Sequence, residues 1–376
     1  MLDQSATNVF DAVRISAMIH CMSRPAIARI NLDHLRYNYR LLKRRAGSSK
    51  IMAVVKANAY GHEQYLVAPT LFEEGCRNFG VTDAREGSEL RAIIGESETA
   101  AITLLSGLFD MDDAELCTDH NLTPVITELH QIKLLTKAEF SGDIWLKFDS
   151  GMNRLGAADP ATLFALAQQA NLQLCGFMSH LACADEPEHP QNRMQAENFT
   201  ELCNRISPQT PKSLLNSAGL ISLPDCRFDT IRPGIALYGA EPLADQPMGL
   251  KPVMKLTGEV MQIREIQAGA TISYGASYRV DSAMKIAVIC MGYADGIPRA
   301  LSNLGAVFIR GEKHHIIGRV CMDYTMVDIS SSNVQVGDQV EFWGEHISAN
   351  EVATQIDTIS YTLFTGVGER VRRKAV

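Results

Sequence analysis

Short apolar runs alternate with amphipathic segments from residue 26 to about residue 240. Brief apolar runs bounded by turn residues predict buried strands, and apolar positions that repeat every three to four residues predict helices. Helices are expected between the strands, and Asp33 and Asp83 have the residue type preferred at helix N-caps. The strands expected from this pattern are 26–32, 51–56, 78–82, 101–105, 123–126, 143–148, 172–180, 213–215 and 230–232.

Strands that alternate with helices predict right-handed βαβ units and a parallel sheet. About eight such units fit, so the pattern favours an α/β fold with an N-terminal (β/α)8 TIM-type barrel over an open sheet. Neither a G-x-G-x-x-G sequence nor a Walker sequence follows a strand, which disfavours the nucleotide-binding folds.

From about residue 250 the pattern changes to one of strands separated by turns such as Gly311-Glu312 and Gly337-Asp338. A helical pattern is confined to 348–356. We therefore expect a disordered N-terminal extension over 1–23, a barrel over 24–245 and a β-rich domain over 246–376. The strands expected in this last domain are 254–266, 285–291, 306–310, 315–328 and 339–343.

Composition narrows the class of protein. The net charge of −8 and the lack of a basic stripe disfavour a nucleic-acid partner. No apolar run approaches the ~18 residues of a membrane span. The nine cysteines form no C-x-x-C pair, and several lie in apolar runs, which is typical of a reduced, cytoplasmic protein.

Chemically capable side chains follow the expected strands where those strands end. In a barrel of this type the C-terminal strand ends form one rim, and functional groups gather there. Each residue alone has an ordinary alternative, for example a surface cation, a hydrogen-bonded core histidine or a helix N-cap. The residues are Lys56, Arg154, His180, Asn216, Ser217 and Arg232.

Lys56 suggests the chemistry of this rim. Burial lowers the pKa of a lysine amine, which frees its lone pair for attack on an aldehyde or for proton transfer. Ser217 at a helix start, with the backbone amides of Gly234 and Ile235, could bind a dianionic phosphate. Together these features suit a phosphate-bearing aldehyde cofactor, although Lys56 could also extend to the solvent.

The stretch Val54-Val55-Lys56-Ala57-Asn58-Ala59-Tyr60-Gly61-His62 resembles the lysine-bearing signature of the alanine racemase family, whose members use pyridoxal phosphate. The resemblance runs in order from about Ala26 to Arg373. Asn153 stands where some members carry glycine. The further matching segments are 149–156, 216–218, 232–239, 273–276, 292–296, 318–323 and 359–361.

This resemblance implies roles for individual residues. Lys56 would hold pyridoxal phosphate as a Schiff base and serve as one acid/base, while Tyr274 of the partner subunit would be the other. The cofactor phosphate would be held by Tyr60, Ser217, Gly234, Ile235 and Tyr361, next to Asn216. Arg232 would face the pyridine nitrogen, and Arg154 the 3′-oxygen and the substrate carboxylate. Met322 of the partner would also meet that carboxylate, and Tyr293 with Tyr361 would narrow the entrance.

Three further expectations concern tuning. A relay through His180 to cationic Arg232 would adjust Tyr274, which is a poor base at its ordinary pKa near ~10. Arginine cannot accept a proton, so the ring nitrogen would stay neutral and side reactions would be limited. Lys147 would be carbamylated and hold Arg154, or else would be a plain lysine paired with Asp149.

No metal site is expected in the cluster formed by His180, Cys183, Asp185, Glu186 and His189, because the spacing of these residues fits no common zinc pattern.

The resemblance thus implies a homodimeric enzyme that interconverts L-alanine and D-alanine, for peptidoglycan synthesis or for D-alanine degradation. A barrel-type decarboxylase or a racemase of serine or broader range is the enzymatic alternative, and Arg232 disfavours the decarboxylase. A pyridoxal-phosphate-binding carrier is the alternative from another class, and it would lack the β-rich domain.

Overall fold

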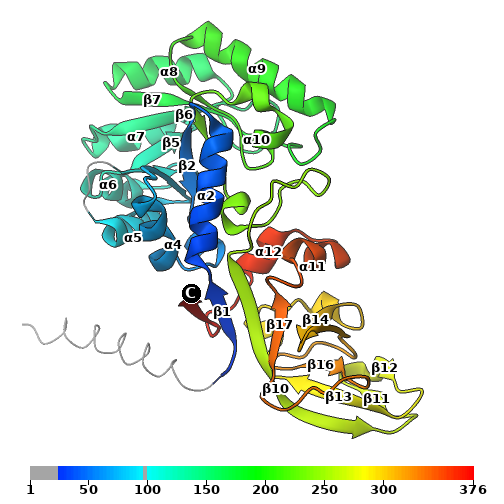
Figure 1. Cartoon of the computed structure of the whole chain (residues 1–376). Helices are drawn as coiled ribbons and strands as arrows, with labels where there is room; N and C mark the ends of the chain where they lie inside the picture. Colours follow the sequence, from blue (N-terminus) through cyan, green and yellow to red (C-terminus); the bar gives the residue numbers. More distant parts are fainter. Residues whose placement is uncertain (1–23, 96–99) are drawn as a thin grey trace, which may run out of the picture. The chain divides into compact units, whose positions relative to one another are not determined.

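The computed structural model describes residues 24–95 and 100–376 and divides them into two compact units (Figure 1). One unit is Leu32–Lys251. The other combines Pro252–Val376 with the described residues that precede Leu32. The change of unit after Lys251 falls at the end of the Pro-containing stretch 241–252. Among the described residues, no helix has both the length and the apolar character that a bilayer crossing requires.

The unit Leu32–Lys251 is built on an eight-stranded sheet in the order β8-β7-β6-β5-β4-β3-β2-β9, and each neighbouring pair is parallel. The strands at the ends of this order are joined: the Asp229 N–H donates to the Lys212 carbonyl (3.1 Å), and the Arg232 N–H to the Leu215 carbonyl (2.9 Å). The expected barrel is therefore confirmed. Its strands are β2 (Lys50–Val54), β3 (Asn78–Val81), β4 (Ala101–Leu104), β5 (Thr123–Ile126), β6 (Asp143–Lys147), β7 (Gln173–Met178), β8 (Lys212–Ser213) and β9 (Thr230–Ile231).

Helices connect the strands, and aspartates cap several of them. The side chains of Asp83, Asp110 and Asp159 accept a backbone N–H at the starts of α5, α6 and α8, as N-caps do. The helices of this unit are α2 (Leu32–Ala46), α3 (Lys56–Tyr60), α4 (Gln64–Glu73), α5 (Ala84–Ile94), α6 (Met111–Asp119), α7 (Leu129–Lys137), α8 (Pro160–Gln169), α9 (Pro190–Ile206), α10 (Gly219–Ser222) and the 3₁₀ turns η1 (Pro224–Cys226) and η2 (Ile235–Tyr238).

Residues Ile27–Ile30 form a strand, β1, but this strand does not belong to the barrel as expected. It pairs antiparallel with β10 (Met254–Ile266) and parallel with β18 (Arg372–Ala375), in the other unit. Its burial pattern explains the difference, because Ala28 and Ile30 are fully buried whereas the alternating residues Ile27 and Arg29 are not. Such alternation suits a sheet with one buried face, whereas barrel strands covered on both faces are continuously apolar.

The second unit is a mixed sheet in the order β15-β14-β17-β10-β1-β18, with β13 on β10 and β16 on β13. Strand β10 has 13 residues and pairs with three other strands, and irregular register at residues 256–257 and 260–262 accompanies its passage from β17 to β13. The remaining elements are β11 (Thr271–Ile272), η3 (Tyr274–Ala276), β12 (Tyr278–Arg279), β13 (Met284–Ile289), η4 (Tyr293–Asp295), η5 (Arg299–Leu301), β14 (Ala306–Ile309), β15 (Glu312–His315), β16 (Thr325–Asp328), β17 (Gln339–Trp343), α11 (Ala349–Gln355) and α12 (Ser360–Thr365).

Three details of this unit differ from expectation. The run 315–328 is not one strand, because Gly318 takes a left-handed φ of +72° and residues 316–324 form a loop between β15 and β16. Helix α12, with six residues, is too short for a periodic pattern to reveal. Strand β18 is absent from the strands expected from the sequence, and its residues Arg372, Arg373 and Lys374 suit the edge of a sheet.

Candidate active site

Lys56 lies just beyond strand β2 of the barrel and opens α3. Partial burial is the main cause that lowers the pKa of its amine, and the nearby cation Arg154 lowers it further, while Glu86 acts in the opposite direction. A lowered pKa leaves more of the amine neutral at a given pH, and only the neutral amine is a nucleophile or a base. Lys56 is therefore a candidate for the reactive amine considered in the sequence analysis.

The backbone after Lys56 takes an unusual form. Ala57, Asn58, Ala59 and Tyr60 all have φ between 51° and 54°, in the left-handed region. This conformation costs an L-residue roughly 1–2 kcal/mol each. The Glu86 carboxylate holds the turn by accepting the N–H groups of Ala57 and Thr82, both at 2.7 Å. Strain kept in place by dedicated bonds marks the segment as a candidate functional site.

Tyr60, Ser217 and Gly234 converge beside this turn. The Ser217 hydroxyl accepts the N–H of Gly234 (3.0 Å) and that of Ala236 (3.3 Å). A Cβ on Gly234 would lie only 2.5 Å from the Tyr60 hydroxyl, so glycine is needed for this approach. Ile235 opens η2, whose own hydrogen bonds do not use the first N–H. The hydroxyls of Tyr60 and Ser217 therefore lie close to the N–H of Ile235 and to the N–H of Gly234, which is bound to Ser217 in this structure. We call this group the cradle, and hydroxyls and backbone amides of this kind suit a phosphate.

Asn216 fixes the turn that carries Ser217. Its Oδ1 accepts the Gly219 N–H at 2.8 Å, so this oxygen supports the start of α10. Tyr60 in turn stacks on the buried Tyr238, with ring centroids 4.9 Å apart, and the Tyr238 hydroxyl donates to the Val54 carbonyl of β2. The cradle is therefore anchored to strand β2 and to α10.

Arg232 follows β9 and is buried. Its guanidinium donates to the Ser213 hydroxyl (2.5 Å) and to the carbonyls of Ser179 (2.5 Å) and Leu214 (3.1 Å). Burial lowers the pKa of Arg232 to about 9, which leaves the group cationic at neutral pH. Sequence reasoning missed Ser213 as a partner, since it is the first residue of the expected strand 213–215 and nothing local marks it as a contact of Arg232.

His180 receives a hydrogen bond from the same guanidinium. Arg232 Nη2 lies 3.1 Å from His180 Nδ1, and because arginine only donates, Nδ1 is the acceptor. Burial lowers the pKa of His180 well below its ordinary value, and the cations Arg232, Lys147 and Arg154 lower it further. The ring is therefore neutral, and its proton sits on Nε2, where it can be donated to another group.

Lys147 ends strand β6 and is buried among cations. Burial, then Arg232, Arg154 and Lys56, lower its pKa to about 8. No ion pair joins Lys147 to Asp149 in the described part of the chain. The Asp149 carboxylate instead accepts the backbone N–H groups of residues 151, 152 and 153. These contacts order the loop that presents Arg154, whose side chain is exposed.

Other residues of the His–Cys–acid cluster considered in the sequence have structural partners. Cys183 donates to the Gln191 side chain, and His189 caps α9 by accepting the Gln191 N–H. Both residues therefore support the loop between β7 and α9.

The remaining candidates, Tyr274, Tyr293, Met322 and Tyr361, belong to the second unit. Their side chains are exposed, with 71% of Tyr274 and 52% of Met322 accessible. Tyr274 follows Ser273, which has an unusual φ of +67° and whose hydroxyl donates to the Arg319 carbonyl at 2.6 Å. The backbone that presents Tyr274 is thus fixed although the phenol is exposed.

Met322 lies on a loop held by a buried charge. The N–H groups of Tyr293 and Ala294 donate to the carbonyls of Cys321 (2.9 Å) and Met322 (3.1 Å). The neighbouring Asp295 is fully buried, pairs with Arg24 and Arg370, and accepts the Gly292 N–H. Asp295 and Arg370 are supporting residues that sequence reasoning did not single out.

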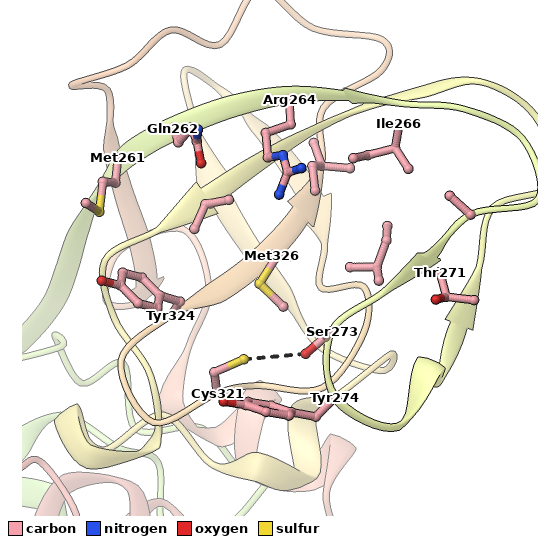
Figure 2. A pocket seen from close by; sticks show the side chains of 14 residues that line it. Met261, Gln262, Arg264, Ile266, Thr271, Ser273, Tyr274, Cys321, Tyr324 and Met326 are labelled. Atoms are coloured by element: carbon pink, nitrogen blue, oxygen red, sulfur yellow. Dashed lines mark hydrogen bonds between the residues drawn. The ribbon is translucent and has the colours of Figure 1, made fainter.

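A cavity of about 900 Å³ opens beside Tyr274 in this unit. Figure 2 shows Tyr274, Ser273 and Cys321 together along one edge, with the Ser273 hydroxyl 3.4 Å from the Cys321 sulfur. The lining of this cavity is largely apolar and comes from β10, β11, β13 and β16, from η3 and from the loops beside these elements. The lining residues are Met261, Gln262, Arg264, Ile266, Ala270, Thr271, Ile272, Ser273, Tyr274, Ile286, Val288, Cys321, Tyr324 and Met326.

Comparison with known proteins assigns both units. Residues 30–242 match the alanine racemase N-terminal domain, and residues 253–375 match the alanine racemase C-terminal domain. An alanine racemase of Azoarcus sp. is 40% identical over 356 residues, which cover 93% of this chain and 99% of the relative. The biosynthetic alanine racemase of Pseudomonas aeruginosa is 38% identical over 361 residues, with 93% and 99% covered.

Solved structures agree. The crystal structure of the biosynthetic alanine racemase from Pseudomonas aeruginosa superposes with a TM-score of 0.88 at 37% identity and covers 94% of this chain and 100% of that one. The alanine racemase from Bartonella henselae, solved with covalently bound pyridoxal phosphate, gives a TM-score of 0.88 at 33% identity and the same coverage. The chain therefore belongs to the alanine racemase family.

Proposed function

We propose that this protein interconverts L-alanine and D-alanine with pyridoxal phosphate as its cofactor. The observation that carries the proposal is Lys56, an amine whose pKa is lowered by burial and by Arg154, on the same turn as Tyr60, which meets Ser217 and Gly234 in the cradle. The relatives named above are alanine racemases, and the one from Bartonella henselae binds pyridoxal phosphate covalently. One relative is named biosynthetic, which favours the supply of D-alanine over its degradation.

The residues present fit this cofactor. Lys56 would bind its aldehyde carbon, and the cradle of Tyr60, Ser217, Gly234 and Ile235 would take its phosphate, with Tyr361 and the turn at Asn216 as further support. Arg154 would bind the 3′-oxygen and the substrate carboxylate. When bound, pyridoxal phosphate withdraws electrons from the amino acid and acidifies its α-hydrogen.

Inversion at the α-carbon needs proton transfer on two opposite faces. Two groups, one on each face, accomplish this without a base that migrates. Lys56 would serve one face, and Tyr274 of a partner subunit the other, in a homodimer whose sites are shared. Met322 and Tyr293, on the loop region held by Asp295, would then bind the substrate carboxylate and narrow the entrance.

Tyr274 would be tuned through His180. A phenol is a poor base at its ordinary pKa near ~10. His180 is neutral with its proton on Nε2, so it can donate to a phenolate oxygen while Arg232 holds its Nδ1. This donated bond would favour the ionised phenol and lower its pKa.

Arg232 would face the pyridine nitrogen as a cation. Since arginine has no acceptor, the ring nitrogen would stay unprotonated, which weakens electron withdrawal. Weaker withdrawal would still allow proton exchange at the α-carbon and would limit slower side reactions such as transamination. Arg232 would therefore act on reaction specificity.

Lys147 would be carbamylated by CO₂. Its pKa of about 8 leaves a fraction of the amine neutral at physiological pH. In the reaction the neutral amine attacks the carbon of CO₂, a nitrogen–carbon bond forms as one C=O π bond opens, and one proton leaves, which gives a carbamate anion. Counted from the lysine cation, two protons are released. That anion would be flanked by Arg154 and Arg232, so burial among cations would favour it. Intact-protein mass spectrometry, with and without bicarbonate, tests this by the added mass of one CO₂.

A reduced, cytoplasmic setting suits the eight described cysteines, which are all free thiols. The direct test of function is to incubate the pure holoenzyme with L-alanine, and separately with L-serine and L-lysine, and to follow optical rotation. Loss of optical rotation with L-alanine supports the proposal, provided that the rotation stays constant when the Lys56→Ala variant replaces the wild-type enzyme. Retained rotation with all three amino acids, or release of CO₂, would refute it.

A further inference from the structure

Helix α9 presents three amide side chains on one face. Gln191, Gln195 and Asn198 are spaced by four and three residues, so they share that face of the helix. Each of them hydrogen-bonds to the backbone of a loop that follows β6 or β7. These two loops carry Arg154 and His180.

On the Arg154 side, two amides bind the loop after β6. Gln191 Nε2 donates to the Gly151 carbonyl (2.8 Å), and Asn198 Nδ2 to the Ser150 carbonyl (3.2 Å). The loop's N–H groups are already bound to the Asp149 carboxylate. Donors and acceptors of this loop are thus both fixed directly before Arg154.

On the His180 side, Gln195 is fully buried and forms two bonds with one loop. Its Nε2 donates to the His180 carbonyl (2.9 Å), and its Oε1 accepts the Ala182 N–H (2.8 Å). This side-chain amide binds the backbone of the loop as the backbone of a paired strand would, with one donated and one accepted hydrogen bond. It therefore fixes the backbone orientation of His180.

The two sides are joined through buried serines. Gln195 Nε2 lies 3.5 Å from the Ser150 hydroxyl, which is 2.8 Å from the Ser179 hydroxyl. The Ser179 carbonyl accepts from Arg232, and Arg232 also donates to His180. The hydrogen bonds form a closed ring from α9 through both loops to Arg232 and back to His180.

We propose that the amide face of α9 consists of positioning residues: Gln195 orients His180 toward its proton-relay position, while Gln191 and Asn198 orient Arg154 toward the substrate carboxylate. This inference rests on the proposed function for what His180 and Arg154 do. It predicts different kinetic consequences for the two kinds of amide, because proton transfer and substrate binding are different steps. A residue that merely stabilised the fold would show no such division.

The first test measures kcat and KM for alanine with the holoenzyme. Gln195→Met keeps the side-chain volume but removes both bonds, so kcat should fall about 10- to 100-fold with little change in KM, as expected for a small displacement of a catalytic group. The double variant Gln191→Met/Asn198→Leu should instead raise KM about tenfold with a smaller effect on kcat. Asn204→Leu, at an exposed amide of the same helix, is the matched control and should change neither.

The second test uses pH. In Gln195→Glu, the protonated acid can donate to the His180 carbonyl and accept from Ala182, whereas the carboxylate can only accept. The activity of Gln195→Glu relative to wild type should therefore rise as the pH falls, while that of Gln195→Met should not change. A constant ratio for Gln195→Glu would overturn the role given to Gln195.

Hydrogen–deuterium exchange separates this inference from the proposed function, because it requires no turnover. Gln195→Met should increase exchange in 179–184, the double variant should increase it in 149–156, and the rest of the barrel should be unaffected. Uniformly faster exchange, or equal kinetic losses in both variants, would show a purely structural role and overturn the proposal. If wild type fails to racemise alanine but the exchange pattern holds, the proposed function fails and the positioning by α9 survives.

Discussion

The barrel rim and the loops around Tyr274 present their functional groups in opposite ways. At the rim, Arg232 is 5% and Ser217 is 2% exposed, and both form hydrogen bonds within their own unit. In the β-rich unit the supporting groups are buried, as Asp295 is, while Tyr274 and Met322 are exposed. The barrel rim thus has buried functional side chains, whereas the loops around Tyr274 have a fixed backbone and exposed functional side chains.

This difference has a physical meaning. The cations at the rim favour anionic groups such as a phosphate and a carboxylate: Lys147 and Arg232 are buried, and Lys56 is partly buried and close enough to the exposed Arg154 for that cation to lower its pKa. Exposed aromatic and methionine side chains on a rigid loop are typical of a surface that meets another protein. The proposed enzyme combines the two, with the barrel of one chain and the displayed residues of another.

The largest expected effect comes from the barrel. Lys56→Ala removes the amine that we propose as both the cofactor's attachment point and one proton carrier, so racemisation should fall by at least about 10⁴-fold. Polarimetry on purified protein measures the loss. Lys56→Arg is the matched variant that keeps a charge without a nucleophile, and it should be equally inactive. Activity in either variant above about one hundredth of wild type would contradict the role of Lys56.

The next effect comes from the displayed region. Tyr274→Phe removes only an exposed hydroxyl, so folding should be unchanged, while activity should fall about 10²- to 10⁴-fold for lack of an acid/base. Thermal unfolding and polarimetry on the same sample provide both readouts. Tyr278→Phe, in the adjacent strand β12, is the control and should be active. If Tyr274→Phe and Tyr278→Phe have similar activity, Tyr274 is not an acid/base in the reaction.

Arg232 distinguishes reaction specificity from simple loss of activity. Arg232→Glu places a carboxylate where the ring nitrogen would bind, which should lower racemisation about 10²-fold and increase transamination, measured as pyruvate release. Arg232→Lys keeps the cation and should not release pyruvate. Equal pyruvate release by both variants would contradict the account of Arg232.

A smaller and directional effect is expected for His180→Leu, with about tenfold loss as for other supporting groups. L-alanine and D-alanine have equal free energies, so kcat/KM must fall equally in both directions. The diagnostic readout is the isotope effect with α-deuterated alanine, which should rise for the direction that uses Tyr274 as base. Since the pKa of His180 lies well below its ordinary value, wild type should show no titration of this histidine near neutral pH. Equal isotope effects in the two directions would exclude the relay.

The smallest effect concerns the phosphate cradle. Gly234→Ala places a Cβ 2.5 Å from the Tyr60 hydroxyl, so that hydroxyl must move away. Affinity for pyridoxal phosphate should fall about tenfold, the equivalent of about one lost hydrogen bond to a charged group. Fluorescence titration of the apoenzyme measures it. In the Tyr60→Phe background, Gly234→Ala should lower the affinity for pyridoxal phosphate less than it does in wild type. If the losses of affinity from the two substitutions simply add, the Tyr60 hydroxyl does not mediate the effect of Gly234→Ala.

Much of this site could be predicted from local sequence. The strands of the barrel and the residues after them follow from apolar runs and turn residues, and Lys56, His180 and Arg232 lie where those runs end. The barrel membership of 26–32 could not be read correctly, because a strand's partner depends on distant residues, here Lys255 and Arg373.

Other features had no local signal. The left-handed turn at 57–60 contains two alanines, residues that do not favour that conformation, and it depends on Glu86 from α5. The clamp by Gln195 likewise joins residues from separate helices and loops. Long-range hydrogen bonds of this kind appear only once the fold is known.

The measurement that tests the shared site most directly is complementation between two inactive variants. Lys56→Ala and Tyr274→Phe are unfolded and refolded together, or co-expressed with different tags, and racemisation is measured on the mixture. Random pairing of subunits should restore about one quarter of wild-type activity, because half of the dimers are mixed and each has one intact site. If the mixture stays as inactive as its components while mixed dimers are isolated by their tags, the two groups do not act in one site and the account is wrong.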